Sequence, residues 1–600
     1  MRVFASASVA VLLLLAPWPA SGQESFDLAA LQERVHLRWQ KVPRQVLAFY
    51  YPWYGTPEVS GRWAHWSGVD LLRKRIASST HFPLLGPYDS LDPKVVDQHM
   101  EWAKQGGIDG FISSWWGPND RTDRALPLLL DTAARRGLKI TAYIESVPRG
   151  SVEGAVKRVR YLLERYGRHS AWLKLDGHPV LFVYVRAVNQ IGLAGWLQVI
   201  ATVNERYPGG AVFIADQISR PAARIFDGIH TYNITGQIAG KSLAEIERWA
   251  ESTYPVQVRT AGPDRIACVT IIPGYDDTKL GRPKPRPVTD RHDGGTYRVL
   301  WQQAIAADPD WILITSWNEW HEGSEIEPSL EYGDRELRTT STFAPRFRAL
   351  GPRRRSRSTT GPSLLLPPRI KAKLATAGVG LLPGARSDAF WFLIESGVPL
   401  TPLSWETVAG SGPDPQSLPF LVYAGGEVYR ATVRKRNDVL AALQEYVDHG
   451  GTLLVLPSGP MPFYYDGRSE RRHSVNHARA LGLPLRVAWE QNDGVLRFRV
   501  RAPSILTGLP EEFPFPRGGD RRWRPLVPTM DADVLPLIEL IDESGTSHGL
   551  GAAVVKRGRG RIVYVWFRLL EGDMGRVLQR DIWNYLIEKP DNEQAWRDQR

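Results

Sequence analysis

Short hydrophobic runs alternate with amphipathic stretches over the first half of the chain. Between residues 46 and 320, eight apolar runs each end in polar or aromatic residues. These runs cover residues 46–53, 107–116, 139–145, 179–185, 211–216, 227–233, 268–275 and 311–320. Stretches with helical spacing separate most of them, at residues 93–106, 124–137, 151–166, 194–207, 243–254 and 297–307. The pattern predicts strands and helices in alternation.

Strands that alternate with helices favour a parallel sheet, because a parallel connection needs a crossover long enough for a helix. Eight such units in roughly 300 residues predict a (β/α)8 TIM barrel, which we place at residues 27–350. An open doubly wound sheet is the alternative fold. It is less favoured because no glycine-rich phosphate loop follows the first run.

The second half of the chain begins a new pattern. Residues 351–368 are rich in Arg, Ser and Pro and predict a linker. After it, strand-like runs at 420–424, 452–456, 495–500, 535–541, 551–555 and 561–567 predict a smaller α/β domain over residues 369–590. The runs LVYAGG and KRGRGRIVYVWF resemble amidotransferase-like, flavodoxin-type domains. The catalytic members of that class use a cysteine, and this region has none, so we expect an accessory domain.

The N-terminus predicts an export signal. An apolar stretch at residues 3–16 follows Arg2, and the small residues Ala20 and Gly22 fit cleavage before Gln23. Residues 1–22 are therefore expected to be a signal peptide, with an uncleaved anchor as the alternative, and the mature protein to be periplasmic or extracellular. No later stretch is apolar for long enough to insert stably in a membrane.

Composition narrows the class of protein. Of the 600 residues, 43% are hydrophobic and 23% charged, as in folded soluble proteins. The formal charge is +11, but four arginines lie together at residues 353–357, and no basic module with interleaved aromatics follows, so a nucleic-acid partner is not expected. The one cysteine, Cys268, lies in an apolar run and is expected to be a buried hydrophobic residue.

The most informative segment is residues 311–327, WILITSWNEWHEGSEIE. An apolar run ends here in two carboxylates, Glu319 and Glu322. Paired carboxylates beside aromatic residues indicate glycosidic bond hydrolysis, in which one group is protonated and the other ionised. Side chains three apart on a strand face opposite sides, so both can serve one site only if the chain turns between them. Gly323 permits such a turn, and Trp317 and Trp320 are candidates for an aromatic wall.

Most of the other strand ends carry aromatic or acidic residues as well. Active sites of TIM barrels lie at these carboxyl ends. The ends are Trp53-Tyr54, Trp115-Trp116, Glu145, Tyr184, Asp216, Tyr232-Asn233, Tyr275 and Glu319. One such aromatic residue is best explained by core packing, but eight ends in succession predict a sugar-binding face.

Six motifs, in this order, resemble glycoside hydrolase family 99, the endo-α-mannosidases and endo-α-mannanases. They are FYYPWYG with a following W-x-H-W, SSWWGP, YIE, FDGIHTYN, PGYDD and ITSWNEWHEGSEIE. The resemblance covers about residues 44–335. It implies a (β/α)8 barrel that cleaves internal α-1,2-mannosidic bonds with retention, through a 1,2-anhydro sugar and without a cofactor or metal.

The resemblance also implies residue roles. Glu319 matches the base that takes a proton from the sugar 2-hydroxyl, and Glu322 matches the acid/base at the glycosidic oxygen. Trp116 matches the residue of the subsite beyond the cleaved sugar, as in bacterial mannanase-type members. The predicted substrate-binding residues are Tyr54, His65, Trp116, Glu145, Tyr184, Tyr232 and Asn318.

Some questions stay open at this level. The chain departs from the family's Arg-Pro-Trp-Asn run, having Arg-Pro-Lys-Pro at 282–285, and from its His-Ile-Glu, having Tyr at 143, which leaves the sugar and linkage undecided. An oligo- or polysaccharide substrate is expected, and the oligomeric state is undetermined. The alternatives are a non-catalytic glycan-binding barrel and a protein whose main role lies in the C-terminal domain.

Overall fold

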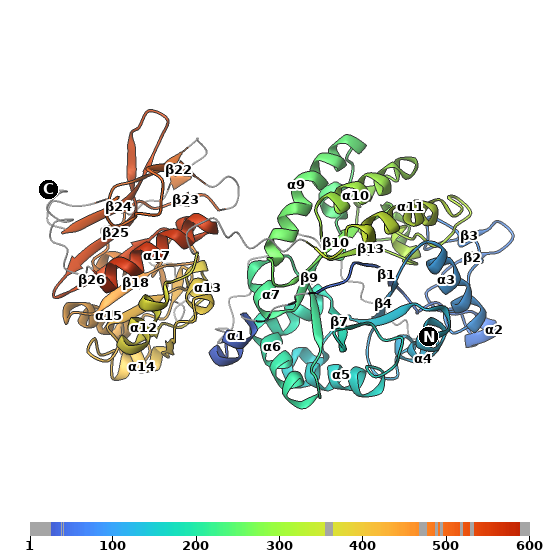
Figure 1. Cartoon of the computed structure of the whole chain (residues 1–600), viewed down its shortest axis with the longest axis horizontal. Coiled ribbons are helices and arrows are strands. Elements are labelled where there is room, and N and C mark those ends of the chain that lie inside the picture. Colours follow the sequence, from blue (N-terminus) through green and yellow to red (C-terminus); the bar gives the residue numbers. More distant parts are fainter. Residues whose placement is uncertain are drawn as a thin grey trace. The chain divides into compact units, whose positions relative to one another are not determined.

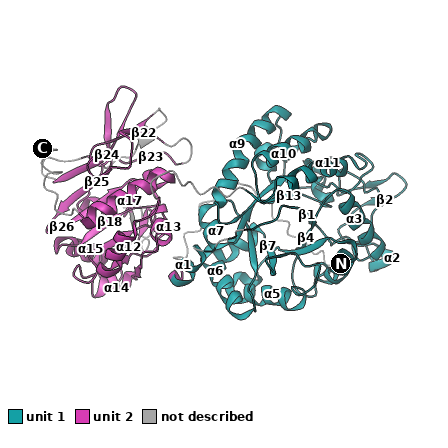
Figure 2. Ribbon diagram, viewed as in Figure 1, with its two compact units in different colours: residues 1–21, 29–357 teal, residues 22–28, 358–600 magenta. Residues whose placement is uncertain are grey.

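The computed structural model describes residues 26–35, 37, 39, 41–353, 364–466, 477–486, 490–491, 496–515, 520–527 and 533–588. The chain divides into two compact units (Figure 2). We call residues 29–357 the barrel unit and residues 358–600, with residues 22–28, the C-terminal unit. The predicted signal peptide and most of the predicted linker lie outside the described residues.

The barrel unit contains a closed ring of parallel strands (Figure 1). In chain order these are β1 (Gln45–Tyr50), β4 (Gly110–Trp115), β5 (Lys139–Ile144), β7 (His178–Val183), β8 (Val212–Asp216), β9 (Gly228–His230), β10 (Ile266–Ile271) and β13 (Trp311–Ile314). Each pairs in parallel with its neighbours, β1 with β13 and β5 with β7 completing the ring. The predicted TIM barrel is confirmed, and the open sheet is wrong.

Six predicted helices and one further helix, which is the last in this unit, surround the ring. They are α3 (Pro93–Gln105), α4 (Arg121–Arg136), α5 (Val152–Arg165), α6 (Val185–Arg206), α9 (Leu243–Ala261), α10 (Gly295–Ala306) and, last in the unit, α11 (Arg335–Ala349). Side chains of Asp92, Asp120 and Ser151 accept backbone N–H groups at the starts of α3, α4 and α5. Helix α6 begins well before the predicted 194 because it joins two helical segments across Gly192, where φ is 67°.

Shorter elements of the barrel unit lie mostly in its loops. They are α1 (Leu28–Val35), α2 (Pro57–Ser60), β2 (Val69–Asp70), β3 (Arg75–Ile76), β6 (Lys174–Leu175), α7 (Arg220–Ile225), α8 (Thr235–Ile238), β11 (Tyr275–Asp276) and β12 (Val288–Thr289). Inside the ring, buried residues such as Phe49, Tyr143, Phe182 and Trp311 form one continuous core. This packed interior leaves the strand ends as the place for a site.

The C-terminal unit is built on one mixed sheet. Its strands are β14 (Val379–Leu381), β15 (Thr401–Pro402), β16 (Phe420–Tyr423), β18 (Thr452–Val455), β21 (Arg497–Val500), β22 (Glu512–Pro514), β24 (Val534–Ile541), β25 (Ser547–Arg557) and β26 (Gly560–Val565). The parallel part has the order β15-β14-β16-β18-β26, which is the flavodoxin-type order 2-1-3-4-5. Strands β25, β24, β21 and β22 extend it in antiparallel fashion.

Helices and two-residue strands complete the C-terminal unit. The helices are α12 (Pro368–Ala377), α13 (Asp388–Glu395), α14 (Trp405–Gly410), α15 (Asp438–Asp448), α16 (His477–Leu481) and α17 (Gly572–Glu588), and the strands are β17 (Val428–Tyr429), β19 (Tyr465–Asp466), β20 (Glu490–Gln491) and β23 (Arg522–Trp523). A second α/β domain is thus confirmed. Across the residues described in both units, no helix has the length and apolarity needed to cross a membrane.

Candidate active site

The chain turns directly after β13 and brings the two predicted catalytic residues onto one side. Glu319 precedes a 3-10 turn, Trp320–Glu322, and Gly323 ends it with φ at 58°. Side chains therefore no longer alternate between two faces, as they do along a strand, between Glu319 and Glu322. A Cβ atom at Gly323 would lie 2.9 Å from Thr80 Oγ1 and 3.1 Å from the Asp276 carbonyl oxygen, so both the φ angle and the space require glycine.

Glu319 is held within a short polar network. Its side chain is buried, and its backbone N–H donates to Ser316 Oγ at 2.8 Å. His321 Nδ1 lies 3.2 Å from Glu319 Oε1, and His321 Nε2 lies 2.6 Å from the carbonyl oxygen of His65. Burial lowers the pKa of His321, but the hydrogen bond and the charge of Glu319, the His65 carbonyl oxygen and the charge of Glu322 together outweigh burial, so this pKa is raised. A histidine cation is therefore favoured beside the Glu319 carboxylate.

Glu322 has the electrostatics of an acid. Burial, and then the negative charge of Glu319, raise its pKa to about 8. The Tyr232 hydroxyl donates to Glu322 Oε2 at 3.4 Å. Burial raises the pKa of Tyr51 and Tyr232, and the charges of both glutamates raise it further, so both carboxylates lie close to the same two hydroxyl groups. Glu322 is thus protonated at neutral pH.

Two further predicted substrate-binding residues, Glu145 and Tyr184, follow β5 and β7, which are neighbouring strands of the ring. Glu145, at the end of β5, is buried; Ser114 Oγ donates to its Oε1 at 2.8 Å and Arg186 Nη2 to its Oε2 at 3.1 Å. Burial raises the pKa of Glu145 to about 7. Tyr184, half-buried at the end of β7, lies with its ring 6.1 Å from that of Tyr232.

Trp116 and His65 lie at the more exposed edges of the site. Trp116, half-buried after β4, has the Arg186 guanidinium 4.6 Å from its ring centre. His65 stacks on Trp53, with ring centres 4.6 Å apart and planes within 2°. Partial desolvation of the His65 ring, and then the positive charge of His321, lower the pKa of His65 to about 4. The His65 side chain is therefore neutral at neutral pH.

Tyr54 and Asn318 lie behind the turn that carries the glutamates. Both are fully buried. The Tyr54 hydroxyl donates to the Asn318 carbonyl oxygen at 3.0 Å and accepts from the Trp320 backbone N–H at 3.2 Å. Asn318 exchanges hydrogen bonds with the backbone of Tyr51, at 2.7 and 3.1 Å. Their polar groups are thus used within the protein, where they brace the turn.

The aromatic wall expected from tryptophans is formed by other residues. Trp317 and Trp320 are fully buried. Trp317 packs on Phe111, and the Trp320 indole N–H donates to Glu327 at 3.1 Å. The charge of Glu322 instead raises the pKa of four tyrosines, besides that of His321. These tyrosines are Tyr51, Tyr184, Tyr232 and Tyr275. The tryptophan expectation failed because the turn after Ser316 directs both indoles into the core.

The sequence argument missed Arg186, Tyr51 and the partnership of His321 with Glu319. Tyr51 belonged to the FYYPWYG motif, and His321 lay between the two glutamates, so both carried a signal. Arg186 carried none, because its contacts with the residues just after β4 and β5 exist only once the barrel closes. Among the described residues, no cluster of three or more His, Cys, Asp or Glu side chains is arranged to hold a metal ion.

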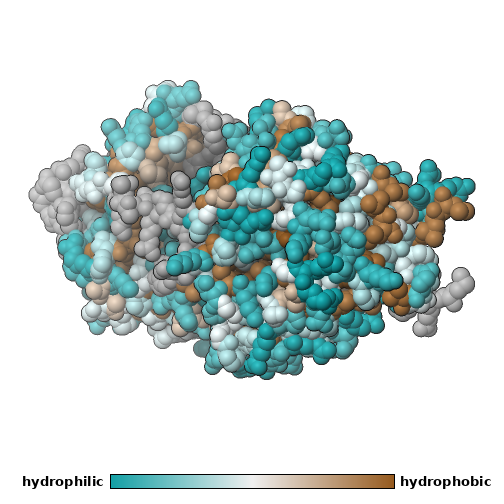
Figure 3. All heavy atoms as spheres, turned by 45° about the vertical axis from the view of Figure 1, so that its right-hand side comes forward, coloured by the Kyte–Doolittle hydropathy of each residue, from teal (hydrophilic) through white to brown (hydrophobic). Residues whose placement is uncertain are grey.

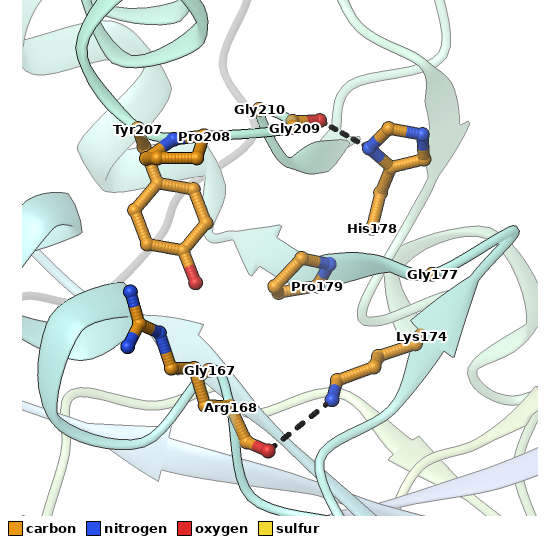
Figure 4. Close-up of a pocket in the computed structure, with 10 residues that line it drawn as sticks. All are labelled: Gly167, Arg168, Lys174, Gly177, His178, Pro179, Tyr207, Pro208, Gly209 and Gly210. Carbon is orange, nitrogen blue, oxygen red and sulfur yellow. Dashed lines mark hydrogen bonds between the residues drawn. The ribbon is translucent and has the colours of Figure 1, made fainter.

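A surface cavity lies at the opposite ends of the strands (Figure 4). It is lined by Arg168, Lys174, His178 and Tyr207, together with glycines and prolines that follow α5, lie in β7 or just before it, or follow α6. Lys174 Nζ donates to the Arg168 carbonyl oxygen at 3.4 Å. His178 begins β7, so this cavity is on the N-terminal face of the barrel, which serves stability rather than catalysis in this fold.

A TIM barrel with two glutamates on one turn at its C-terminal face fits a glycoside hydrolase. Residues 42–338 match the model of Glycosyl hydrolase family 99, and this part of the chain belongs to that family. The resemblance inferred from six motifs is thereby confirmed.

Individual relatives agree with the family. The chain is 28% identical over 323 residues to the glycoprotein endo-alpha-1,2-mannosidase of Mus musculus, covering 47% of this chain and 67% of the relative. With the Rattus norvegicus enzyme of that name it shares 28% over 325 residues, 48% of this chain and 68% of the relative. Among solved structures it is similar to the GH99 endo-alpha-mannosidase from Bacteroides thetaiotaomicron, with 27% identity, a TM-score of 0.45, and coverage of 51% and 98%.

Proposed function

We propose that this glycoside hydrolase cleaves internal α-mannosidic bonds, of the α-1,2-mannan type, with retention of configuration. The names of its relatives and the six motifs support a mannose glycan as substrate. The observation that carries the proposal is the pair of unlike carboxyls on one turn. Glu322 holds a proton at neutral pH, while Glu319 lies against a histidine whose pKa is raised.

In the proposed first step, a Glu319 carboxylate oxygen takes the proton of the sugar 2-hydroxyl, and the oxygen of that 2-hydroxyl attacks C1 of the same sugar. The bond from C1 to the leaving oxygen breaks as Glu322 gives its proton to that oxygen. A 1,2-anhydro sugar results. In the second step, Glu322 takes a proton from water, the water oxygen attacks C1, the bond from C1 to the 2-oxygen opens, and Glu319 returns its proton to that oxygen. Two inversions at C1 give net retention.

The test is hydrolysis of a panel of α-mannans and α-gluco-oligosaccharides by the full chain, with NMR of the first-formed anomer. The proposal expects an α-anomer from an internally cleaved mannan. Glu319→Gln and Glu322→Gln should each reduce kcat by about 10³-fold or more while the far-UV circular dichroism stays unchanged. Glu58→Gln is the matched control, because Glu58 is an exposed glutamate of the same unit.

The outcomes separate the alternatives. A β-anomer as first product, or wild-type rates in either active-site variant, would exclude the proposed mechanism. Tight oligosaccharide binding without product release would favour the non-catalytic glycan-binding barrel. Hydrolysis of the gluco-oligosaccharides alone would assign a different sugar to the same site.

We further propose that the protein is exported to the periplasm or beyond the cell. The apolar stretch at residues 3–16 and the small residues before Gln23 support it. N-terminal sequencing of protein recovered from the extracytoplasmic fraction should find Gln23 first. An intact Met1 terminus in a membrane fraction would favour an uncleaved anchor instead.

A further inference from the structure

Exposed hydrophobic side chains are concentrated on the loops of the catalytic face. Among the described residues, twelve large hydrophobic side chains are more than a third exposed, and seven of them come from the segments after β1 and β13. These seven are Val59, Trp63, Leu71, Leu72, Leu84, Leu85 and Leu330. The other five are scattered over both units, so the seven form a concentration of exposed hydrophobic surface, which is typical of an interaction site. The two segments are linked directly, by the Leu84 N–H donating to the Pro328 carbonyl at 2.8 Å.

The most exposed of these residues form the tip of the β2–β3 hairpin. Leu71 is 61% exposed and Leu72 98% exposed, and both are followed by the exposed cations Arg73, Lys74 and Arg75. The base of the hairpin is anchored, because Ile76 is buried in the core cluster that also contains Tyr54 and Trp320. Hydrophobic and strongly hydrophilic surface lie together at the right-hand end of the molecule in Figure 3, the side that carries β2 and β3 in Figure 1.

The chemistry of this tip selects one kind of partner. Leucines offer neither hydrogen bonds nor flat rings to a sugar, so an extended polysaccharide is not favoured. Arg73 forms an ion pair with Asp70 at 3.0 Å, so the tip keeps a net charge of +2, from one acid and three basic residues. An apolar tip with this positive charge suits an anionic lipid surface, where leucines enter the headgroup boundary and cations approach phosphates. We propose that the β2–β3 hairpin docks the catalytic face on an anionic lipid surface. Resting on the proposed function, this makes the substrate a mannose glycan displayed on lipid.

The test uses the full chain and needs no glycan. Wild-type protein should sediment with vesicles of phosphatidylcholine and phosphatidylglycerol and far less with phosphatidylcholine alone. Leu71→Asp with Leu72→Asp should reduce that partition at least tenfold, whereas Leu350→Asp, at another exposed leucine of the barrel unit, should not. Hydrolysis of a soluble manno-oligosaccharide should be unchanged in both variants.

Several results would overturn the docking proposal. These are no vesicle binding by the wild type, equal binding by the hairpin variant, or equal loss in the Leu350 control. A wild-type dimer that the hairpin variant abolishes, without vesicle binding, would assign the patch to self-association. Because the vesicle assay does not depend on turnover, its failure is distinct from a failure of the proposed hydrolysis.

A separate observation concerns Arg186, the second residue of α6. Its Nε donates to the Glu145 carbonyl oxygen at 3.0 Å and its Nη2 to Glu145 Oε2 at 3.1 Å. Its guanidinium also lies 4.6 Å from the Trp116 ring centre and 5.3 Å from that of Tyr184. One cation thus joins three residues that come from the ends of three different strands.

We infer that Arg186 is a positioning residue, which holds the Glu145 carboxyl group in place and fixes the Trp116 ring for the sugar. Burial raises the pKa of Glu145, and the negative charges of Glu319 and Asp216 add to this, whereas Ser114 and Arg186 lower it. The hydroxyls of Tyr51, Tyr143 and Tyr184 also face this carboxylate. Without Arg186, Glu145 would therefore keep its proton to higher pH.

The test is the pH dependence of kcat/KM on a soluble substrate, and this inference also rests on the proposed function. In Arg186→Met, the acid limb of the kcat/KM profile should shift to higher pH by about one unit or more. KM should rise by a larger factor than kcat falls. Arg186→Lys should restore the limb in part, and Arg165→Met, an arginine on tyrosine rings elsewhere, should change neither. A uniform loss at all pH values in the methionine variant would mean a merely structural role. An inactive wild type would count against the proposed hydrolysis itself.

Discussion

Replacing the proposed acid should make the barrel more stable. Glu322 has a folded pKa of about 8 against an ordinary 4.5, so at pH 7 the folded state binds a proton that the unfolded chain has released. At about 1.4 kcal/mol per pH unit, the interval from 4.5 to 7 lowers the free energy of unfolding of the barrel by about 3 kcal/mol, which we call the Glu322 penalty. Below pH 4.5 both states are protonated and no penalty exists. The penalty grows as pH rises from 4.5 to 8. Glutamine has no proton to lose and removes it.

The assay is calorimetry of the full chain, wild type and Glu322→Gln, at pH 4.5 and pH 7.5. The barrel transition is identified in the wild type by the parallel loss of activity. The variant should melt about 5 °C higher at the upper pH, as expected for about 3 kcal/mol in a domain of this size, with little difference at the lower pH. Glu58→Gln should show no pH-dependent difference. An equal shift at both pH values, or a variant less stable at both, would refute the reasoning.

Three further predictions concern the same turn. The alkaline limb of kcat/KM should fall near pH 8, where Glu322 loses its proton, and a profile flat to pH 10 would contradict its role as acid. Gly323→Ala should destabilise the barrel by about 1–3 kcal/mol and lower kcat, because of its φ of 58° and the contact at 2.9 Å, and unchanged melting would contradict this. Glu327→Ala should cost about 1–3 kcal/mol in stability for each buried group that loses its partner, since the Glu327 carboxyl group contacts His99 Nε2 at 3.0 Å and accepts from the Tyr88 hydroxyl at 2.7 Å. In that variant the alkaline limb should stay in place, measured on the fraction that folds.

The sequence predicted what depends on local pattern. Apolar runs predicted the eight strands, and the spacing of apolar residues predicted most of the helices between them. Both patterns involve only residues that are close together in the sequence. The two glutamates were found because residue types that are chemically costly to bury followed an apolar run. Side chains three apart on a strand face opposite sides, so the two glutamates required a turn between them if they were to share a site. The structure has this turn, and it ends at Gly323.

What the sequence could not predict depends on contacts across the barrel. Trp317 and Trp320 were candidates for an aromatic wall of the site, yet both are buried in the core. Glu325 and Glu327 could have continued an acidic surface, but they are buried, Glu325 against Arg291 at 2.7 Å. Arg186 contacts Trp116 and Glu145 because their strands lie close together in the closed barrel. The spacing of these residues along the chain does not predict which strands are neighbours.

The central claim is that Glu319 and Glu322 act on one sugar ring. A crystal structure of Glu319→Gln or Glu322→Gln, soaked with an α-1,2-linked manno-oligosaccharide, measures it directly. The account predicts residue 319 within about 3 Å of the 2-hydroxyl, and residue 322 within about 3 Å of the glycosidic oxygen of that same sugar. A glycan bound with either side chain directed away from that ring would contradict it.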